Sequence, residues 1–353
     1  MPRRGRLYIP EGCYHVIGRG LERRYLFEDS ADKRDFLSRL GQNLRRSGAQ
    51  CLAWALMFNH YHFLILLGVQ PLGKLMAPAL GGFAGNYNRR HHRSGYVFQN
   101  RFTSILCDEG SYLLELVRYI HLNPMRAKMI ESVSDLGKYP WTGHAGMIVR
   151  CRQNWHAVEE VLPHFDQGPS IARRKYLEFI EAGAANSDGA SLSGGGLVRS
   201  YGSWESVGQL RKEQIVCIGD ERILGESEFV TRVLKEDEFR LESKSKISRD
   251  GWTIDKLVIW VCAHYEVEQS ALYVRSRDNS VSKAKAVICY LAAEKLGIST
   301  TEIAAQLGIS RQAASKWIPK GRKESETEAC LEAFKVTEGF VGALGNYGCT
   351  ANI

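Results

Sequence analysis

The sequence predicts an α+β protein in which a sandwich of strands and helices is followed by an all-α region. Three observations indicate this. The 353 residues are 44% hydrophobic and 24% charged, which is the composition of globular domains. Residues 1–150 alternate between strand-like and helix-like patterns, whereas the residues after about 250 show helical spacing. The length itself is typical of a chain with roughly two or three domains.

Seven elements are expected within residues 1–150, and the first six form a recognisable order. The first four are a strand over 13–18, a helix over 31–46, and two strands over 50–58 and 61–69 joined by a tight turn at Asn59. A helix over 71–93, a strand over 96–107 and a helix over 111–122 follow, and Pro124 starts one more helical turn. The order β-α-β-β-α-β along the chain is that of a ferredoxin-like sandwich.

The rest of the chain divides into three further parts. Residues 151–240 show little pattern, and the five Gly, four Ala and three Ser within 182–196 indicate a linker, with short helices expected near 175–180 and 206–234. Residues 241–323 carry helical patterns over 254–265, 282–296 and 299–318. Residues 324–353 turn acidic and then Gly-rich, which is typical of a loosely ordered tail. The predicted domains are therefore 1–150, 151–240, 241–323 and 324–353.

Charge is distributed unevenly over these parts. Residues 1–150 carry 21 Lys and Arg against 11 Asp and Glu, and residues 241–323 carry 14 against 8. The middle part, 151–240, is acidic, with 11 against 15. Two basic regions therefore flank an acidic one, which favours a polyanion such as nucleic acid as partner.

Cysteine usage and apolar stretches indicate the compartment. The nine cysteines are scattered and form no CxxC pair, which argues against a zinc ribbon or a disulfide framework and favours reduced, mostly buried thiols. The longest apolar stretches, 52–58 and 63–69, are too short to span a bilayer, and no apolar signal core follows the N-terminus. We expect a cytoplasmic protein.

A pair of histidines lies within one of the predicted strands. His60 and His62 are two residues apart, so both side chains project from the same face of the sheet. Two imidazoles at this spacing can share one divalent cation. The alternative interpretation is a pair of histidines on a half-buried face or at a strand end.

A tyrosine and an asparagine share one side of the predicted helix over 111–122. Tyr119 and Asn123 are one helical turn apart, and Glu115 lies one turn earlier on the same stripe. Arg118 and Arg126 flank this stripe with positive charge. The stripe offers a phenol beside an oxygen ligand. The alternative is that Tyr119 caps the core and that the Asn-Pro pair ends the helix.

The third motif is a helix-turn-helix over 299–318. Ser299 and Glu302 form a capping box, Gly308 occupies the turn and Ser310 caps the second helix. An ordinary αα-hairpin is the alternative interpretation. The exposed side of the second helix would then carry the side chains suited to contact DNA, which are Arg311, Gln312, Ser315 and Lys316.

Residues 7–145 resemble the HUH single-stranded DNA nucleases that use one tyrosine, and most closely the REP-associated tyrosine transposases, relatives of the IS200/IS605 transposases. Four segments in the same order carry the resemblance: 14–20, 57–64, 94–102 and 119–127. Residues from about 250 to 318 resemble the C-terminal DNA-binding domain of the DnaA initiator. The second helix of the motif lacks the signature of that initiator, so its DNA specificity does not carry over.

The resemblance implies an enzyme that cuts and rejoins hairpin-forming single-stranded DNA. Mg²⁺ or Mn²⁺ held by His60, His62 and a third group would neutralise the phosphodiester, and Tyr119 would attack it to form a 5′-phosphotyrosine and a free 3′-OH. Related enzymes use Gln as third ligand one turn past the tyrosine. Asn123 stands at that place here, and Glu115 or water is the fallback.

Other residues are expected around this site. Arg19, Arg89, Arg90, Arg93 and Arg101 could line a DNA path, or could form a solvated basic face. His15 on the first strand could approach the site, but we expect it to be a core histidine, and we expect His91 and His92 to lie on the surface.

The partners implied are single-stranded hairpin DNA for the N-terminal part and duplex DNA for the C-terminal part, with a monomer or homodimer as the assembly. Two other interpretations stay open. The protein could be a domesticated DNA-binding regulator with a silent nuclease site, or a metal-dependent hydrolase that forms no covalent intermediate.

Overall fold

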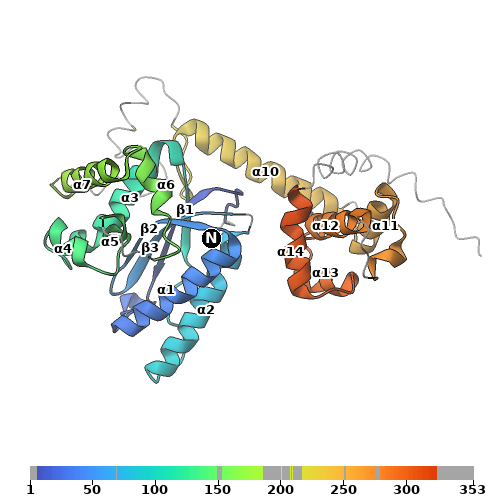
Figure 1. The fold of residues 1–353 in the computed structure, drawn as a ribbon, viewed down its shortest axis with the longest axis horizontal. Helices are drawn as coiled ribbons and strands as arrows, with labels where there is room; N and C mark the ends of the chain where they lie inside the picture. Colours follow the sequence, from blue (N-terminus) through green and yellow to red (C-terminus); the bar gives the residue numbers. More distant parts are fainter. Residues whose placement is uncertain are drawn as a thin grey trace, which may run out of the picture. The chain divides into compact units, whose positions relative to one another are not determined.

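The chain folds into two compact units, residues 1–237 and 238–353 (Figure 1). The computed structural model describes residues 6–68, 70–148, 153–185, 200, 207, 209, 217–249, 252–274 and 279–323. Each unit has its own hydrophobic core. None of the helices within the described residues is long and apolar enough to cross a membrane.

The N-terminal unit is built on a five-stranded mixed sheet of strand order β2-β3-β1-β4-β5. Its strands are β1 (Cys13–Arg19), β2 (Gln50–Leu56), β3 (His60–Leu66), β4 (Thr103–Cys107) and β5 (Ile223–Leu224). β1 is antiparallel to both β3 and β4, and β2 is antiparallel to β3. β5 pairs with β4 in parallel. The first four strands thus supply the predicted β-α-β-β-α-β sandwich, and the fifth is an addition to it.

Helices cover both faces of this sheet (Figure 1). α1 (Ser30–Ser47) and α2 (Leu72–Arg90) pack on one face, over a core that includes Phe36, Phe63 and Phe83. α3 (Glu109–Arg126) and α7 (Pro169–Ala185) pack on the other, over a core that includes Leu64, Val117, Ile120 and Ile180. Phe63 and Leu64 fall in different cores because neighbouring residues of a strand point to opposite faces.

The middle of the chain belongs to the N-terminal unit, although the sequence suggests a linker region there. Ile223, Val230 and Val233 join the core beneath α1 and α2, while Val158 and Tyr176 join the core beneath α3. A strand of two residues is too short to show the alternation by which strands are predicted, so the sequence does not indicate β5.

The remaining elements of this unit are η1 (Leu21–Arg23), α4 (Val133–Lys138), α5 (Gly143–Ile148), α6 (Val158–Val161), η2 (Leu162–His164) and α10 (Ser227–Arg249), which runs past the boundary between the units.

Several boundaries differ from those expected. α3 continues through Pro124 to Arg126, because a proline so near the end of a helix removes only one backbone hydrogen bond. The strand expected over 96–107 is confined to β4, since the chain before it turns along the end of β1, where Phe98 forms an isolated bridge with Gly20. α7 extends to Ala185, and the rest of the expected linker, 186–196, lies outside the described residues.

The C-terminal unit is helical. It contains α11 (Ile254–His264), η3 (Gln269–Leu272), α12 (Asn279–Glu294), α13 (Thr300–Gln306) and α14 (Arg311–Lys323). Val258, Leu291 and Ile303 are fully or almost fully buried in its core. α14 approaches α12 closely at Gly321, where a Cβ atom would lie 2.1 Å from the carbonyl oxygen of Ala286. The expected tail, 324–353, lies outside the described residues.

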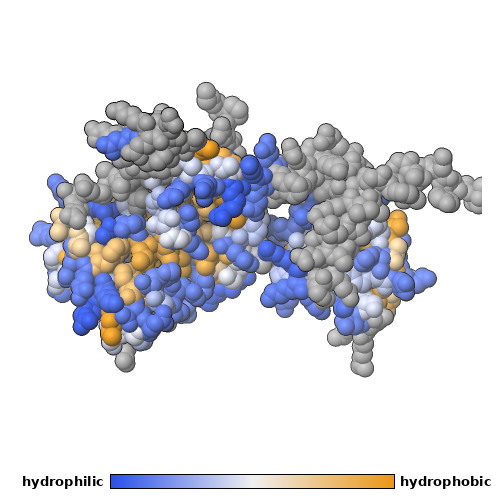
Figure 2. All heavy atoms as spheres, turned by 90° about the horizontal axis from the view of Figure 1, so that it is seen from above, coloured by the Kyte–Doolittle hydropathy of each residue, from blue (hydrophilic) through white to orange (hydrophobic). Residues whose placement is uncertain are grey.

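The surface of the N-terminal unit mixes apolar and polar areas. On the face seen in Figure 2, apolar residues form a broad area framed by hydrophilic ones. The six described cysteines are free thiols, and all but Cys217 are buried.

Candidate active site

The histidine pair lies on the face of the sheet that α3 covers. In the register of β1 and β3, Ile17 is opposite His62 and Arg19 is opposite His60. Residues directly opposite in an antiparallel pair project to the same face, and so do residues two apart in one strand. His15, Ile17 and Arg19 of β1 therefore share a face with His60 and His62 of β3.

Hydrogen bonds fix the orientation of the His60 ring. Asn59 donates its Nδ2 hydrogen to the carbonyl oxygen of Arg23 over 2.9 Å, which turns its Oδ1 toward His60 Nδ1, 2.7 Å away. Because Oδ1 can only accept, Nδ1 of His60 carries the hydrogen and Nε2 keeps its lone pair. A second group that holds Nδ1–H in this way is what metal-binding histidines commonly have.

His62 is held by a third histidine. His15 Nε2 and His62 Nδ1 lie 2.9 Å apart, and the centroids of the two rings are 5.1 Å apart. The rings of His60 and His62 are 5.2 Å apart. If His62 Nδ1 donates to His15, then Nε2 of His62 also presents a lone pair, and both members of the pair can bind a cation through Nε2.

Burial keeps the rings of His60 and His62 uncharged. His15 and His62 are 4% and 5% exposed. Burial, with smaller effects of the neighbouring histidines and Arg19, lowers the pKa of His62 well below its usual range. Burial and the charge of Arg19 lower the pKa of His60 to about 4. Both imidazoles are therefore neutral at pH 7, which is the form that binds metal ions.

Tyr119 lies against the histidines. Its ring meets His15 and His62 edge-on, at centroid distances of 5.9 and 6.0 Å. Leu116, Val117 and Ile120, all buried in the core beneath α3, hold this turn of the helix on the sheet. The phenol is only partly buried, so the site is open to a substrate.

Arginines of α3 flank the tyrosine. The Arg126 guanidinium lies 5.0 Å from the centroid of the Tyr119 ring and donates to the Tyr119 carbonyl oxygen over 3.3 Å. Arg118 is paired with Glu115 at 2.5 Å and covers the ring of Phe179 at 4.3 Å. Arg126 is exposed and forms no ion pair with a carboxylate of the described residues, so its charge suits a phosphate, whereas the charge of Arg118 is compensated by Glu115.

Asn123 lies one turn from Tyr119, as the helical spacing predicts. It is 9% exposed, and its Nδ2 donates to the Tyr119 carbonyl oxygen over 3.0 Å. Its Oδ1 is therefore the atom with lone pairs to offer a cation. Glu115 is exposed and ion-paired with Arg118, which makes it the weaker candidate for this role.

The candidate metal ligands at this site are imidazole nitrogens and an amide oxygen, with no carboxylate, and such ligands suit a hard or borderline divalent ion. Within the part of the chain that the structure describes, no three His, Cys, Asp or Glu side chains are grouped to hold a metal ion. A cation at the histidine pair would therefore take an amide oxygen or water as third ligand. Two neutral Nε2 atoms and an amide oxygen such as Asn123 Oδ1 would make up a donor set of this kind, and Asn123 as the third ligand stays a prediction.

The predicted DNA-contacting arginines fall into two groups. Arg19 at the end of β1 and Arg101 before β4 are exposed and line one hollow of about 240 Å³. Arg89 is exposed at the end of α2. Arg93 lies near the ring of Tyr87, with 5.7 Å between guanidinium and ring centroid.

Arg90 is ion-paired within the N-terminal unit, and its contact with DNA stays a prediction. Its guanidinium pairs with Asp32 and, at 2.7 Å, with Asp29, which caps the N-terminus of α1. The hydrogen bond from Arg90 and the backbone bonds of the cap lower the pKa of Asp29 to about 2. His91 joins the same cluster, 3.0 Å from Asp32, and its side chain is only 17% exposed. Both side chains thus tie α2 to α1, while His92 is exposed as predicted.

His15 combines the two alternatives that the sequence leaves open. It is buried, as predicted for a core histidine, but it touches both His62 and Tyr119 and so belongs to the site. His121 and His144 are two more histidines near the site, and no sequence pattern singles them out. His121 Nδ1 and His144 Nδ1 lie 2.8 and 2.7 Å from the hydroxyl of Tyr176, in the core behind α3. His121 stands between Tyr119 and Asn123, so this network holds the turn that carries both.

In the C-terminal unit, the predicted helix starts are confirmed. Ser299 and Glu302 form the capping box of α13, and Ser310 Oγ accepts a hydrogen bond from the Ala313 amide over 3.1 Å. Gly308 has φ +61° in the turn between α13 and α14. The four side chains proposed to contact DNA, Arg311, Gln312, Ser315 and Lys316, are exposed on α14. Their role in DNA binding stays a prediction.

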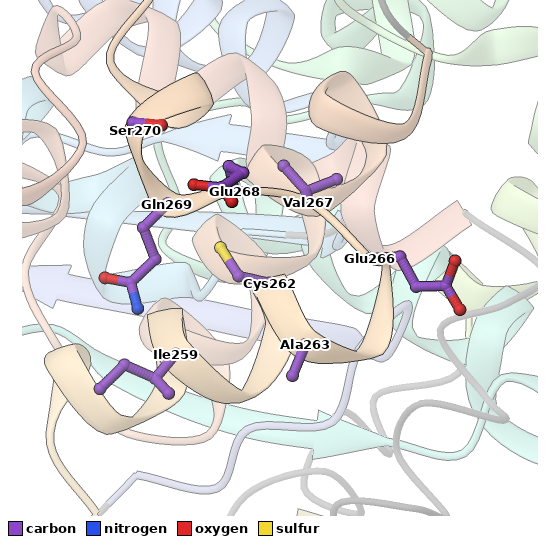
Figure 3. A pocket seen from close by; sticks show the side chains of 8 residues that line it. All are labelled: Ile259, Cys262, Ala263, Glu266, Val267, Glu268, Gln269 and Ser270. Atoms are coloured by element: carbon purple, nitrogen blue, oxygen red, sulfur yellow. The ribbon is translucent and has the colours of Figure 1, made fainter.

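A second hollow lies between α11 and η3 (Figure 3). It has a volume of about 630 Å³ and is lined by Ile259, Cys262, Glu266, Glu268 and Gln269, among others. Its two charged side chains, Glu266 and Glu268, are acidic, so this hollow does not suit a polyanion such as DNA.

The solved structures similar to this chain include two transposases. One is a REP-associated tyrosine transposase bound to a REP hairpin; it is 15% identical, covers 45% of this chain and 90% of its own, and has a TM-score of 0.37. The other is a candidate transposase from Deinococcus radiodurans R1; it is 15% identical, covers 38% of this chain and 97% of its own, and has a TM-score of 0.24. No family model and no curated protein matches the chain.

Proposed function

We propose that this protein is a metal-dependent transposase that cleaves and rejoins hairpin-forming single-stranded DNA through a 5′-phosphotyrosine. One observation carries the proposal: the ring of Tyr119 lies against His62 and His15, with His60 beside them. A phenol from α3 and two neutral imidazoles from β3 thus meet at one partly open place, with His15 of β1 against them. Basic side chains around it, including Arg19 and Arg126, suit a phosphodiester.

The residues can be given roles. Mg²⁺ or Mn²⁺, bound through Nε2 of His60 and His62 and Oδ1 of Asn123, would supply Lewis-acid neutralisation of the phosphodiester. Tyr119 loses its hydroxyl proton and forms the new bond from oxygen to phosphorus. The bond from phosphorus to the 3′ oxygen breaks, and that oxygen takes up a proton. The reverse step on a second 3′-OH joins strands without ATP, because the phosphotyrosine conserves the bond energy.

The C-terminal unit is proposed to bind duplex DNA. α14 presents Arg311, Gln312, Ser315 and Lys316 to solvent, and these side chains suit base edges and phosphates in a major groove. The cutting and the duplex-binding functions would then reside in different units.

One observation favours a second candidate function, a DNA-binding regulator with a silent nuclease. Among the described residues no carboxylate is grouped with the histidine pair to hold a metal ion, and the third histidine, His15, turns its Nε2 toward His62. A regulator would bind hairpin DNA without cutting it.

A covalent-adduct assay separates these functions. A hairpin oligonucleotide labelled at its 3′ end is incubated with protein and Mn²⁺ and run on a denaturing gel. Wild-type protein should carry the label, because the downstream fragment stays attached through its 5′ phosphate, and EDTA, His60→Ala or His62→Ala should abolish this. Tyr119→Phe should bind the hairpin but form no adduct, since only the phenolic oxygen is lost. Tyr112→Phe, on the same helix, is the matched control and should keep adduct formation.

The other outcomes are equally informative. Cleavage without an adduct would identify a hydrolase, and hairpin binding without cleavage would identify a regulator. An adduct formed by Tyr119→Phe would show that another residue is the nucleophile.

A further inference from the structure

A small hollow opens beside the histidine pair. It is lined by Ile17, Arg19, Gln99, Asn100, Arg101 and Thr103, and we call it the arginine pocket. Its volume of about 240 Å³ is below the roughly 300–1,000 Å³ of pockets that hold drug-sized ligands. It therefore has room for one small planar group and not for several.

The sheet places this pocket next to the proposed reaction site. Ile17 of β1 is opposite His62 on one side and opposite Thr103 of β4 on the other. All three side chains thus project to the face that carries the histidines. Arg19 is opposite His60. The pocket therefore begins one strand away from the histidine pair, a distance of about 5 Å.

Positive charge gathers here without acidic partners. Among the described residues, Arg19 and Arg101 form no ion pair with a carboxylate. Arg101 also lies close enough to Arg6 to lower the pKa of that guanidinium, although burial has the larger effect. Uncompensated like charges repel each other, so this arrangement favours an anion between them.

The backbone holds the pocket wall in place. The Gln99 amide donates to the Arg19 carbonyl oxygen over 3.0 Å, and the Leu21 amide donates to the Val97 carbonyl oxygen over 2.9 Å. Arg6 donates to the Phe102 carbonyl oxygen over 2.8 Å and stacks on the Phe102 ring at 3.8 Å. Gln99 is exposed, and the chain on both sides of it is held by these bonds.

We propose that the arginine pocket binds one unpaired nucleotide of the substrate strand, next to the phosphate that Tyr119 attacks. Arg19 and Arg101 hold the phosphates of this nucleotide, and Gln99 and Asn100 read the edge of its base. Side-chain amides and guanidinium groups make paired hydrogen bonds with purines, so the preferred base is a purine. The pocket is then the specificity determinant of the strand that is cut. The identity of that strand rests on the proposed function.

Binding measurements with cleavage switched off test this proposal. The parent protein is the full chain carrying Tyr119→Phe, and the probes are fluorescent hairpins with an abasic site, a purine or a pyrimidine at each position of the single-stranded flank. At one position an abasic site or a pyrimidine should weaken binding about tenfold, which is the loss expected for one paired base contact. Adding Gln99→Ala should remove this discrimination. Arg101→Ala should weaken binding to all probes alike and reduce the salt dependence.

The matched control is Gln42→Ala, which removes an exposed glutamine of α1. It should leave the discrimination unchanged. The pocket is not the base-reading site if the parent protein discriminates at no position, or if Gln99→Ala discriminates as the parent does. Thermal unfolding of each variant excludes loss of folding as the cause. Because no cleavage is needed, a wild-type protein that forms no adduct would contradict the proposed function and leave this result standing.

Discussion

His15 shows how one side chain can belong to a core and to a site at once. It is buried between β3 and α3, yet its Nε2 meets His62 Nδ1 at 2.9 Å and its ring meets Tyr119. If His62 binds a cation through Nε2, His15 is the acceptor that keeps the proton on Nδ1. His15 would then act through His62, as a positioning residue.

We expect His15→Ala to weaken cation binding while leaving hairpin affinity unchanged. Loss of the group behind a metal-binding histidine typically lowers metal affinity by about 10- to 100-fold. Titration of Mn²⁺ followed by the EPR signal of the free ion measures this without any reaction. His92→Ala removes an exposed histidine and should bind Mn²⁺ like the wild type. Equal Mn²⁺ affinity of His15→Ala and wild type would assign His15 to packing alone.

Among the elements, α3 is joined to α5 and α7 by a buried polar network of His121, His144 and Tyr176. The Tyr176 hydroxyl has one hydrogen, so it can donate to only one of the two ring nitrogens, His121 Nδ1 and His144 Nδ1, and must accept from the other. The two histidines are therefore different tautomers. Both Nε2 atoms are buried and have no hydrogen-bond partner in the described structure. This network joins α7 and α5 to the turn that carries Tyr119 and Asn123.

Tyr176→Phe should destabilise the N-terminal unit. It leaves both Nδ1 atoms without their partner, and an unsatisfied buried group costs about 1–3 kcal/mol. Urea unfolding followed by tryptophan fluorescence measures the change. Tyr61→Phe is a sharp control, because the Tyr61 hydroxyl is buried and has no hydrogen-bond partner in the described structure. Its removal should be neutral or stabilising. Equal effects of the two substitutions would show that the network contributes nothing.

The same network predicts sensitivity to acid. Burial lowers the pKa of His144 from 6.5 to about 4. The ring stays neutral in the folded protein, whereas the unfolded chain takes up a proton as the pH falls below 6.5. The contribution of His144 to the free energy of unfolding is therefore fully present above pH 6.5. Between pH 6.5 and about pH 4 it is lost at about 1.4 kcal/mol per pH unit. Asp29, with its pKa of about 2, loses its contribution only at lower pH.

Urea midpoints at pH 7.5, 6.0 and 5.0 test this dependence. The free energy of unfolding should fall across this series, and His144→Gln should make the fall shallower. A constant free energy of unfolding between pH 7.5 and 5.0 would contradict the prediction.

At the scale of the whole molecule, the two basic regions belong to separate compact units. The N-terminal unit contains the candidate active site, and the C-terminal unit presents α14. Division of labour follows if one unit cuts single strands and the other binds duplex. The charges of α14 then contribute to duplex affinity and not to cleavage of a short hairpin.

Lys316→Ala should weaken duplex binding. The slope of the logarithm of the binding constant against the logarithm of the salt concentration should become shallower by about one, because one phosphate contact is lost. Cleavage of a hairpin without duplex flanks should be unchanged. Lys256→Ala removes another exposed lysine of the same unit, on α11, and should leave both properties as they are. Fluorescence titrations at two salt concentrations measure the slope. Unchanged duplex affinity in Lys316→Ala would identify α13 and α14 as an ordinary helical hairpin.

Local patterns in the sequence are enough to show which residues share a side of one element. Alternation in a strand places His60 and His62 together, helical spacing places Tyr119 and Asn123 together, and the capping box marks the start of α13. These features depend only on backbone geometry over a few residues, so they can be read without knowledge of the fold.

Only the tertiary structure decided which of these elements meet. Packing of α3 on the sheet brings Tyr119 to the histidines and turns His15 into part of the site. The pairing of Arg90 with Asp29 and Asp32 joins residues about 60 positions apart, and β5 adds to the sheet from beyond residue 220. Such contacts depend on how distant segments bury their apolar faces together, and no local periodicity encodes that choice.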